Sequence, residues 1–252
     1  MSDRRPARPG RVVALVQARM GSSRFPGKMM APLAGRPLLA WVLERLKRAH
    51  RLDALVLATT DQPRDAALLG LAQALGVATF TGSESDVLGR FSGAARQFEA
   101  DTVVRVCADN PFIDGAVVDQ LVDFYAARDC DYACNHLDRM GSGYADGFGA
   151  EILPAALLHR LAADCTDPRH REHVTIALWD ETGPWARDCR KTCPRAPAAL
   201  AFPELRFDVD EPAHLERLQS LVDEAGLSLE SPAQDCVQAL LAFQAAHSGG
   251  GA

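Results

Sequence analysis

The sequence predicts an α/β fold in which helices cover both faces of a doubly wound, mostly parallel β-sheet, giving three layers. Three observations support this prediction. Short apolar runs rich in β-branched residues alternate with longer segments of helical periodicity through the first half of the chain. Polar loops follow several of these runs. The chain has 252 residues, of which 48% are hydrophobic, so it is long enough to bury a large core.

The elements of the first half can be assigned in order. Each apolar run is followed by a segment with helical spacing, as in successive β-α units. In a sheet built this way, ligands bind outside the carboxyl ends of the strands, near the point where the strand order reverses. The loops after the strands are therefore the expected site of chemistry. The expected strand and helix pairs are 12–16 with 38–49, 55–59 with 65–75, 77–80 with 87–98, and 103–106 with 117–125.

The second half is less regular and predicts an extension of the sheet with mixed strand directions. We expect this extension to cover the binding crevice and to receive a second substrate or a partner chain. A strand is expected over 205–212, a helix starts at its Asp-Glu-Pro end, and a last helix follows over about 232–246. Residues 11–246 are thus expected to form one domain, with a disordered arm at 1–10 and a flexible tail at 247–252.

Charge and composition narrow the class of protein. The formal net charge of −6 argues against a surface that binds double-stranded nucleic acid. The chain has seven cysteines, an odd number that fits reduced thiols better than a disulfide scaffold. No apolar stretch approaches the roughly 20 residues that span a membrane. We therefore expect a cytoplasmic protein with no nucleic-acid or membrane partner. Cys130 and Cys134 with His136, and Cys189 with Cys193, leave a zinc site as an alternative to buried thiols that pack as small hydrophobic groups.

The segment Gln17 to Lys28, QARMGSSRFPGK, follows the first apolar run and has the character of an anion-binding loop. Its small residues let backbone N–H groups approach phosphate oxygens, while Arg19, Arg24 and Lys28 add positive charge. A P-loop is excluded, because Met29 stands where a Ser or Thr would bind magnesium. We predict that the loop binds a polyphosphate. A simple turn with solvated charges is the alternative.

Two carboxylates are candidates for holding the magnesium ion that phosphate chemistry commonly uses. Asp109 follows the fourth apolar run, directly before an Asn-Pro turn. Asp210 lies in the strand expected over 205–212, where alternation places Asp208 on the same face. A turn or cap role for Asp109 and a helix-cap role for Asp210 are the structural alternatives.

Several blocks, taken in order, resemble the cytidylyltransferase family of CMP-Kdo and CMP-sialic acid synthetases, and most closely its branch of SpsF-like spore coat polysaccharide proteins. The first block is highly specific, and the later ones gain weight from their order. The resemblance spans residues 12 to about 220. The blocks are QARMGSSRFPGK at 17–28, ATT at 58–60, GSESDVLGR at 82–90, DNPFID at 109–114, REHVT at 171–175 and FDVDEP at 207–212.

The resemblance implies a nucleotide-diphospho-sugar transferase fold of the GT-A type. It also implies transfer of CMP from CTP to a sugar acid, nonulosonic or Kdo-like, with release of pyrophosphate for polysaccharide biosynthesis. Arg19 and Lys28 would hold the triphosphate, and Asp109 and Asp210 would bind Mg²⁺. A homodimer is a further implication. Nucleotide contacts are also implied for Gln17, Ala18, Gly21, Ser22, Ser23 and Arg24 in the loop, and for Thr60, Asp61 and Arg90 at the base and ribose.

The acceptor site is expected in the second half of the chain. Arg171 is a candidate for binding an acceptor carboxylate in a bidentate manner. His173 is a candidate general base, and Glu151 and Glu172 are candidates for further polar contacts. Surface charge pairing of Arg171 and a structural role for His173 are the alternatives.

The sequence departs from the family pattern at residues 108–110, and two rival functions stay open. The usual Gly-Asp-Cys is replaced by Ala108-Asp109-Asn110, and the extra Cβ at residue 108 is expected to narrow that loop. One rival is a GT-A glycosyltransferase, for which Asp208 and Asp210 formally offer the metal motif. The other is a non-catalytic nucleotide-binding regulator, which would lack a metal carboxylate.

Overall fold

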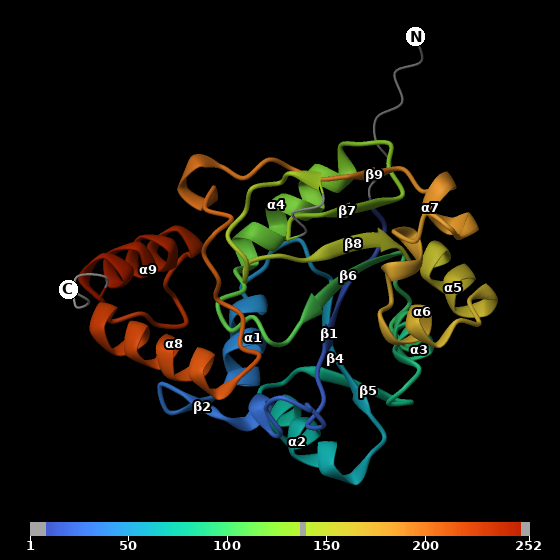
Figure 1. Ribbon diagram of the computed structural model, residues 1–252. Helices are drawn as coiled ribbons and strands as arrows, with labels where there is room; N and C mark the ends of the chain where they lie inside the picture. The colour runs from blue at the N-terminus through green and yellow to red at the C-terminus, as the bar shows by residue number, and fades with distance from the viewer. Residues whose placement is uncertain (1–8, 137–139, 248–252) are drawn as a thin grey trace.

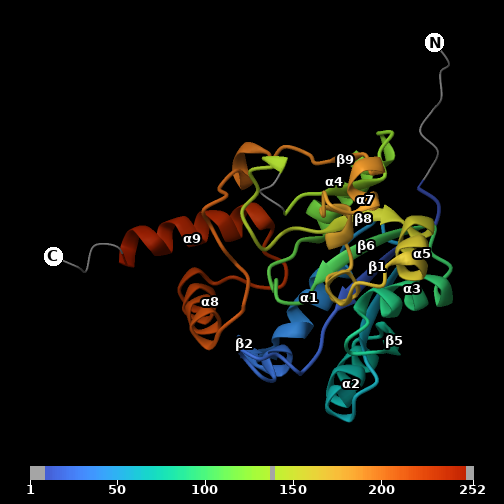
Figure 2. The same ribbon diagram turned by 45° about the vertical axis from the view of Figure 1, so that its right-hand side comes forward.

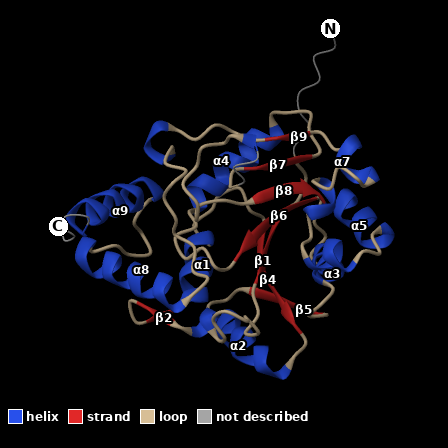
Figure 3. Ribbon diagram, viewed as in Figure 1, coloured by secondary structure: helices blue, strands red, loops and turns tan. Residues whose placement is uncertain are grey.

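The structure, a computed structural model, describes residues 9–136 and 140–247. A seven-stranded sheet with the strand order β5-β4-β1-β6-β8-β7-β9 runs through its centre, and helices cover both faces (Figures 1 and 3). The predicted three-layer α/β fold is confirmed. The expected arm at 1–10 and tail at 247–252 fall almost wholly outside the described residues. Within the described ranges, no helix is both long and apolar enough to cross a bilayer.

The four strands predicted in the first half all form, each within two residues of its expected ends. Three short strands, β7, β8 and β9, extend the sheet in the second half as predicted for that region. The sheet strands are β1 (Val12–Gln17), β4 (Ala54–Thr60), β5 (Ala78–Gly82), β6 (Thr102–Cys107), β7 (Tyr132–Cys134), β8 (Glu151–Pro154) and β9 (Lys191–Thr192), and a separate hairpin pairs β2 (Pro32–Leu33) with β3 (Arg36–Pro37).

The helices follow the strands in the order that the periodicity predicts. The α-helices are α1 (Leu38–Leu46), α2 (Ala66–Ala74), α3 (Val87–Gln97), α4 (Gly115–Ala126), α5 (Ala155–Asp164), α6 (Pro168–Glu172), α7 (Pro184–Asp188), α8 (Pro212–Ala225) and α9 (Ala233–His247). Short 3-10 helices are η1 (Lys28–Met30), η2 (Pro63–Asp65), η4 (Ile176–Leu178) and η5 (Ala198–Leu200).

Two cores lie on opposite faces of the sheet because side chains alternate along each strand. Ala14 and Val16 of β1 pack in the core formed with α1, α4, α8 and α9, whereas Val13 and Leu15 pack in the core formed with α3 and α5. In the turned view of Figure 2, α3 and α5 lie on one side of the sheet, and α8 and α9 lie on the other. The central strand is therefore buried on both faces.

The strand directions bring several loops to one edge of the sheet. Strands β4, β1 and β6 are parallel neighbours, so all three end at the same edge, which we call the carboxyl edge. Strand β8 is antiparallel to β6, and β7 is antiparallel to β8, so β8 begins at this edge and β7 ends there. Because the chain moves from β1 to β4 on one side and places β6 on the other, the strand order reverses between β1 and β6.

The strand predicted over 205–212 does not form. Residue Arg206 makes a single isolated bridge to Asp146, and the rest of this segment is irregular. Its backbone N–H groups bond to two different loops, Phe207 to the carbonyl of Asp146 and Val209 to the carbonyl of Asp109, both at 2.8 Å. A strand needs one continuous partner, and this segment instead fastens two loops of the carboxyl edge together.

Candidate active site

The loop after β1 turns back on itself before it enters η1. The N–H groups of Ser22 and Gly27 both donate to the carbonyl of Met20, at 3.0 and 3.1 Å. Gly27 has φ 76°, a left-handed conformation that costs a residue with a Cβ about 1 kcal/mol or more. The turn places Lys28 at the start of η1 with its ammonium group directed inward, so the loop has the strand-to-helix geometry that the sequence predicts.

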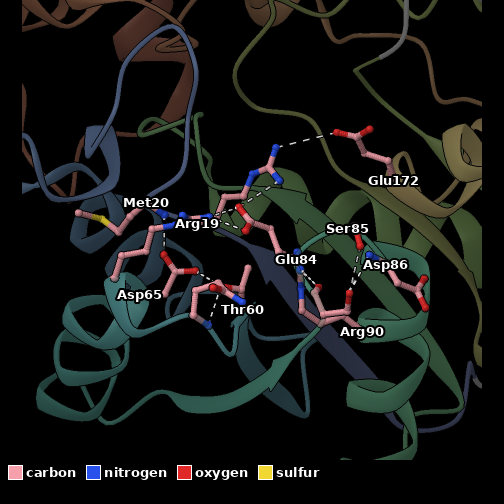
Figure 4. A network of polar contacts seen from close by, with 12 residues as sticks. Arg19, Met20, Thr60, Asp65, Glu84, Ser85, Asp86, Arg90 and Glu172 are labelled. Atoms are coloured by element: carbon pink, nitrogen blue, oxygen red, sulfur yellow. Dashed lines mark hydrogen bonds and ion pairs between the residues drawn. The ribbon is translucent and has the colours of Figure 1, made fainter.

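A buried carboxylate, Asp65, anchors this loop to the neighbouring strand. Its Oδ1 accepts the N–H of Met20 at 2.7 Å, and its Oδ2 accepts the hydroxyl of Thr60 (Figure 4). Asp65 is 0% exposed. Sequence reasoning treated this residue only as the start of a helix, since nothing in the local sequence marks a long-range anchor. The Thr60 hydroxyl is thereby committed to Asp65.

Arg19 extends from the loop toward two carboxylates at longer distances. Its Nη1 lies 3.7 Å from Glu84, and its Nη2 lies 3.9 Å from Glu172 (Figure 4). Glu84 is also bound by Arg64. These separations exceed the length of a hydrogen bond, so Arg19 is held by charge attraction alone. An incoming anion can compete for such a guanidinium at little cost.

Lys28, Asp109, Asp210 and Arg24 form a second group, which we call the Lys28 cluster. The Lys28 Nζ donates to the carbonyl of Val209 at 2.7 Å and lies 3.4 Å from Asp210 and 3.7 Å from Asp109. Arg24 pairs with the other oxygen of Asp210 at 2.9 Å, although its own side chain is 62% exposed. The structure therefore brings together residues that are up to 186 positions apart, as the sequence predicts for the ends of β1 and β6.

Carboxylates crowd the Lys28 cluster. Burial raises the pKa of Asp109, Lys28 opposes that rise, and the negative charge of Asp210 adds to it. Two cations, Lys28 and Arg24, balance the charge of the two carboxylates, and Asp109 has Lys28 as its partner at 3.7 Å. Among residues 9–136 and 140–247, no three His, Cys, Asp or Glu side chains gather as a metal site. An arrangement of two carboxylates suits Mg²⁺, which usually keeps most of its ligands as phosphate oxygens and water.

Asp208 and Asp210 do not share a face, because the expected strand is absent. The Asp208 carboxylate is bound by Arg206 through two hydrogen bonds of 2.9 and 3.0 Å. Burial would raise the pKa of Asp208, but these contacts lower it. Asp210 does not cap α8 either, since the N-cap is Glu211 and has no side-chain cap bond. Only Asp210 of this pair reaches the Lys28 cluster.

The residues predicted at the base and ribose lie beside β4 and α3. Asp61 is exposed, and its N–H bonds to the carbonyl of Gly82. Arg90 is 2% exposed and donates through Nη1 to the carbonyl of Ser83, while its buried Nε and Nη2 have no hydrogen-bond partner among the described residues. Burial and the charge of Arg19 lower the pKa of Arg90 to about 10. Arg90 is a buried cation with unused donors.

The residues predicted for the acceptor site lie in two places: Arg171, Glu172 and His173 at the end of α6, and Glu151 at the start of β8. Arg171 donates to the carbonyls of Ala162 and Cys165 and to Asp86, the N-cap of α3. Glu172 and His173 are exposed at the end of α6. Arg171 therefore joins α6 to α3 and α5 in this structure, while Glu172 is the member of the block that points toward Arg19 (Figure 4).

Glu151 belongs to a third group, the Glu151 cluster, which consists of Arg105, His136 and Glu151. Arg105 Nη1 lies 3.1 Å and His136 Nε2 lies 3.2 Å from the same oxygen, Glu151 Oε1. Arg105 Nη2 also donates to Gln17 Oε1 at 3.3 Å. Sequence reasoning missed Arg105 and the role of His136. A charged residue inside the apolar run 103–106 was the available signal.

Two remaining expectations concern the loop at residue 108 and the cysteines. The Ala108 methyl group packs in the core with Val104 and Val106, so the extra Cβ points away from the loop face. None of the seven cysteines, all of which lie within the described residues, forms a disulfide. Cys193 donates to the carbonyl of Met140 rather than approaching Cys189 and a metal. The zinc alternative finds no support in the described residues.

Known proteins share the sequence pattern and the fold of this chain. A sequence profile of the family described as Cytidylyltransferase matches residues 13–144, about half of the chain. The chain is 27% identical over 220 residues to the spore coat polysaccharide biosynthesis protein SpsF of Bacillus subtilis, covering 85% of this chain and 88% of that protein.

Solved structures show the same relationship. A cytidylyltransferase from Leptospira borgpetersenii superposes with a TM-score of 0.82 at 29% identity, covering 94% of this chain and 95% of that one. A CMP:2-keto-3-deoxy-manno-octonic acid synthetase complexed with CTP superposes with a TM-score of 0.61 at 18% identity, covering 85% of this chain and 99% of that one. The second likeness concerns the fold. A 3-deoxy-manno-octulosonate cytidylyltransferase of Anaeromyxobacter sp. is 40% identical over 115 residues, covering 44% of this chain and 46% of that protein. The chain belongs to the cytidylyltransferase family of nucleotidyltransferase enzymes and is homologous to SpsF and the CMP-Kdo synthetases.

Proposed function

We propose that this protein transfers CMP from CTP to a sugar acid and releases pyrophosphate. The observation that carries the proposal is the Lys28 cluster. It joins the end of the loop after β1 to carboxylates from the loop after β6 and from the segment before α8. This junction lies where the strand order reverses, which is where ligands of open α/β sheets bind.

The triphosphate of CTP is proposed to lie along the loop after β1. Arg19 and Lys28 supply its main positive charges, with Arg24 as a third. Gln17, Ala18, Gly21, Ser22 and Ser23 supply backbone and side-chain contacts. The loose contacts of Arg19 with Glu84 and Glu172 support this role, because phosphate oxygens would replace carboxylates at the guanidinium without a new buried charge.

The cytosine and ribose are proposed to lie between β4 and α3. The unused, buried donors of Arg90 support contacts to the nucleotide there, since a buried N–H group without a partner is costly. Asp61 is exposed at the end of β4 and is proposed to face the ribose. Thr60 would contribute through its backbone and through the position that it gives Asp65.

Magnesium is proposed to bind Asp109 and Asp210. The convergence of these carboxylates on one ammonium group supports a metal position here, because Lys28 and Arg24 would turn from them to the triphosphate when CTP binds. When bound, the ion supplies positive charge to the phosphates and lowers the pKa of the attacking hydroxyl. The remaining ligands would come from phosphate oxygens and water, since the described residues offer no third protein ligand of the usual types.

The chain's own residues act by position and charge. Arg19 and Lys28 orient the triphosphate so that the α-phosphorus faces the acceptor hydroxyl, and they neutralise the charge that develops on the departing pyrophosphate. No covalent intermediate on the enzyme is required. Asp65 keeps the loop in place during this step through its bond to Met20.

A sugar acid is proposed as the acceptor because of the family relationship. SpsF is named for polysaccharide biosynthesis, and the structural relative complexed with CTP is a synthetase for a keto-deoxy-octonic acid. The acceptor is proposed to lie over β8 and β7, within reach of Glu172 and His173 from α6. Glu151, at the start of β8, would contribute a negative charge to the acceptor site, and Arg171 would hold α6 in position. A homodimer stays a prediction of the family resemblance.

The test is pyrophosphate release from each of the four nucleoside triphosphates with Mg²⁺ and a panel of sugar acids that includes Kdo and a nonulosonic acid. We expect release with CTP and one acid only. Release that does not depend on any acid, or that is equal for all four nucleotides, would contradict the proposal. Replacing Asp129, an exposed carboxylate between α4 and β7 that pairs with Arg190, by Asn gives a variant that should retain full activity.

A further inference from the structure

Three strands place the Glu151 cluster on the carboxyl edge beside the Lys28 cluster. Arg105 lies two residues before the end of β6, Glu151 opens β8, and the two are direct partners across these strands. His136 follows β7, whose last residue, Cys134, pairs with Glu151 on the other side. The same face of β6 that carries Arg105 also carries Cys107, and the loop beyond it carries Asp109. The charges of both clusters, Arg105 and Glu151 on one side and Asp109 and Lys28 on the other, therefore act on Cys107 between them.

Glu151 is ionised in the folded protein. It is 3% exposed, and burial alone would raise its pKa, but the charge of Arg105 and the hydrogen bond with His136 lower the pKa to about 2. An ionised carboxylate can only accept hydrogen bonds. His136 Nε2, 3.2 Å from Glu151 Oε1, must therefore be the nitrogen that carries a hydrogen.

This contact fixes the tautomer of His136. In a neutral imidazole with hydrogen on Nε2, the other nitrogen, Nδ1, holds a free lone pair. No described residue makes a hydrogen bond to Nδ1, and the His136 side chain is 23% exposed. A carboxylate that holds one ring nitrogen and leaves the other free to take a proton is the arrangement by which hydrolases orient a histidine base.

The ring sits where it does because residue 149 is a glycine. A Cβ at Gly149 would lie 1.8 Å from His136 Cβ, so any side chain there would displace the histidine. The groups that surround the imidazole come from different elements. They are Glu151 from β8, Arg105 from β6, and Asp146 from the preceding loop, whose carboxyl has its pKa raised by burial and by Asp208 while Arg206 and His136 oppose the rise.

We propose that His136 is the general base of the cytidylyl transfer and that Glu151 is its positioning residue. The inference rests on the proposed function. His136 Nδ1 takes the proton of the acceptor hydroxyl as that oxygen forms a bond to the α-phosphorus of CTP. The bond from the α-phosphorus to the bridging oxygen breaks, and its electron pair leaves with pyrophosphate. The imidazolium then returns its proton to solvent, so no further reactant is needed.

The first test reads the tautomer directly in the free enzyme. Nitrogen-15 NMR of imidazole-labelled protein at pH 8 should show His136 with hydrogen on Nε2, assigned by its loss in His136→Gln. Glu151→Gln should remove this preference. Hydrogen on Nδ1 in the wild-type protein would overturn the proposal, because the nitrogen meant to accept the proton would already carry one. This measurement needs no acceptor.

The second test measures pyrophosphate release with CTP and a sugar acid that the wild-type protein accepts. His136→Gln should lower kcat about 10²- to 10⁴-fold, the range for removal of a general base, and leave the Kd for CTP within about twofold. Added imidazole should restore part of the activity of His136→Ala. The double variant with Glu151→Gln should be no slower than His136→Gln alone, because Glu151 acts through the histidine.

A matched control is His159→Gln on α5, where His159 bonds to Ser92 instead of a carboxylate. It should retain activity. A His136→Gln variant within threefold of the wild-type rate would overturn the proposal. If no sugar acid supports turnover by the wild-type protein, the proposed function fails for those acids, and the tautomer then decides whether His136 is poised as a base.

Discussion

The carboxyl edge has two halves, one over β4 and β1 and the other over β8 and β7, and they are assembled in different ways. In the first half, several key contacts are local: the turn from Met20 to Gly27 closes by its own hydrogen bonds, and Thr60 and Asp65 are five residues apart. The bond from Met20 to Asp65 is the long-range exception. In the second half, Arg105 comes from β6, His136 from the segment after β7, and Glu151 from β8. A local motif can be predicted from the sequence. A site made by strand pairing can be found only once the order of the strands in the sheet is known.

The Lys28 cluster joins these halves, and removing one of its carboxylates should have the largest effect. Asp109→Asn should lower turnover by about 10³-fold or more, since a fixed charge at the reacting phosphate is lost while the side-chain volume is kept. Pyrophosphate release measures the rate, and circular dichroism checks the fold. Asp208→Asn is the contrast, because Arg206 rather than Lys28 holds that carboxylate. Equal losses of turnover in Asp109→Asn and Asp208→Asn would contradict the account, because Asp109 would then have no role that Asp208 lacks.

The second half should make folding stability depend on acid pH. Glu151 has a pKa of about 2 in the folded protein against an ordinary value of 4.5. A lowered pKa contributes stability that is fully present above about pH 4.5 and is lost as the pH falls toward 2, by about 3 kcal/mol in total.

Urea unfolding between pH 2 and 6 measures this loss. Glu151→Gln should be less stable than the wild type at pH 6, because Arg105 is left buried without its counter-charge, and its stability should fall less steeply below pH 4.5. Glu181→Gln, a change at an exposed carboxylate, should follow the wild-type curve. Parallel curves for wild type and Glu151→Gln would show that the cluster does not hold Glu151 ionised.

In the first half, Arg19→Gln should weaken CTP binding by about 30-fold, the equivalent of about 2 kcal/mol for a charged hydrogen bond. Calorimetric titration with CTP in the presence of Mg²⁺ measures the change. Arg36→Gln makes the same charge change at an exposed position in the β2–β3 hairpin and should leave the affinity as it is. If both variants bind CTP equally well, the loop after β1 does not hold the triphosphate.

These regions also show how far sequence reasoning reaches. The buried runs at 12–16 and 103–106 predicted β1 and β6 well, because a central parallel strand is apolar on both faces. Asp210 was predicted to meet the end of β6, yet the strand assigned around it does not form, since its hydrogen bonds go to the loops at Asp109 and Asp146. Alternation of apolar and polar residues cannot distinguish a strand from an extended segment that fastens two loops.

The site itself divides in the same way. The loop 17–28 could be predicted to bind a polyphosphate, because glycines and three cations fall in one stretch. His136 gave no such signal, because its partner Glu151 is 15 residues away and the intervening chain has no periodicity. The need for Gly149 beside it follows only from the three-dimensional contact between these two backbones.

The smallest predicted effect concerns the turn that shapes the first half. Gly27→Ala should destabilise the protein by about 1 kcal/mol, because φ 76° is strained for a residue with a Cβ, and should lower Tm by about 2–4 °C. Gly35→Ala has a similar φ of 74° in the β2–β3 hairpin and open space around it, so it should cost about the same. Only the change at Gly27 should also weaken CTP binding. This difference would separate the general cost of a strained glycine position from the effect of strain in the loop after β1.

The central claim is that the phosphorus attacked at this edge is the α-phosphorus of CTP. Phosphorus NMR of the products, with CTP, Mg²⁺ and the accepted sugar acid, tests it most directly. The account predicts equal amounts of pyrophosphate and a new phosphodiester that carries CMP, both formed about 10³-fold or more slowly with Asp109→Asn. Orthophosphate with CDP, or a phosphorylated acid without pyrophosphate, would contradict it, because attack would then have occurred at the terminal phosphate.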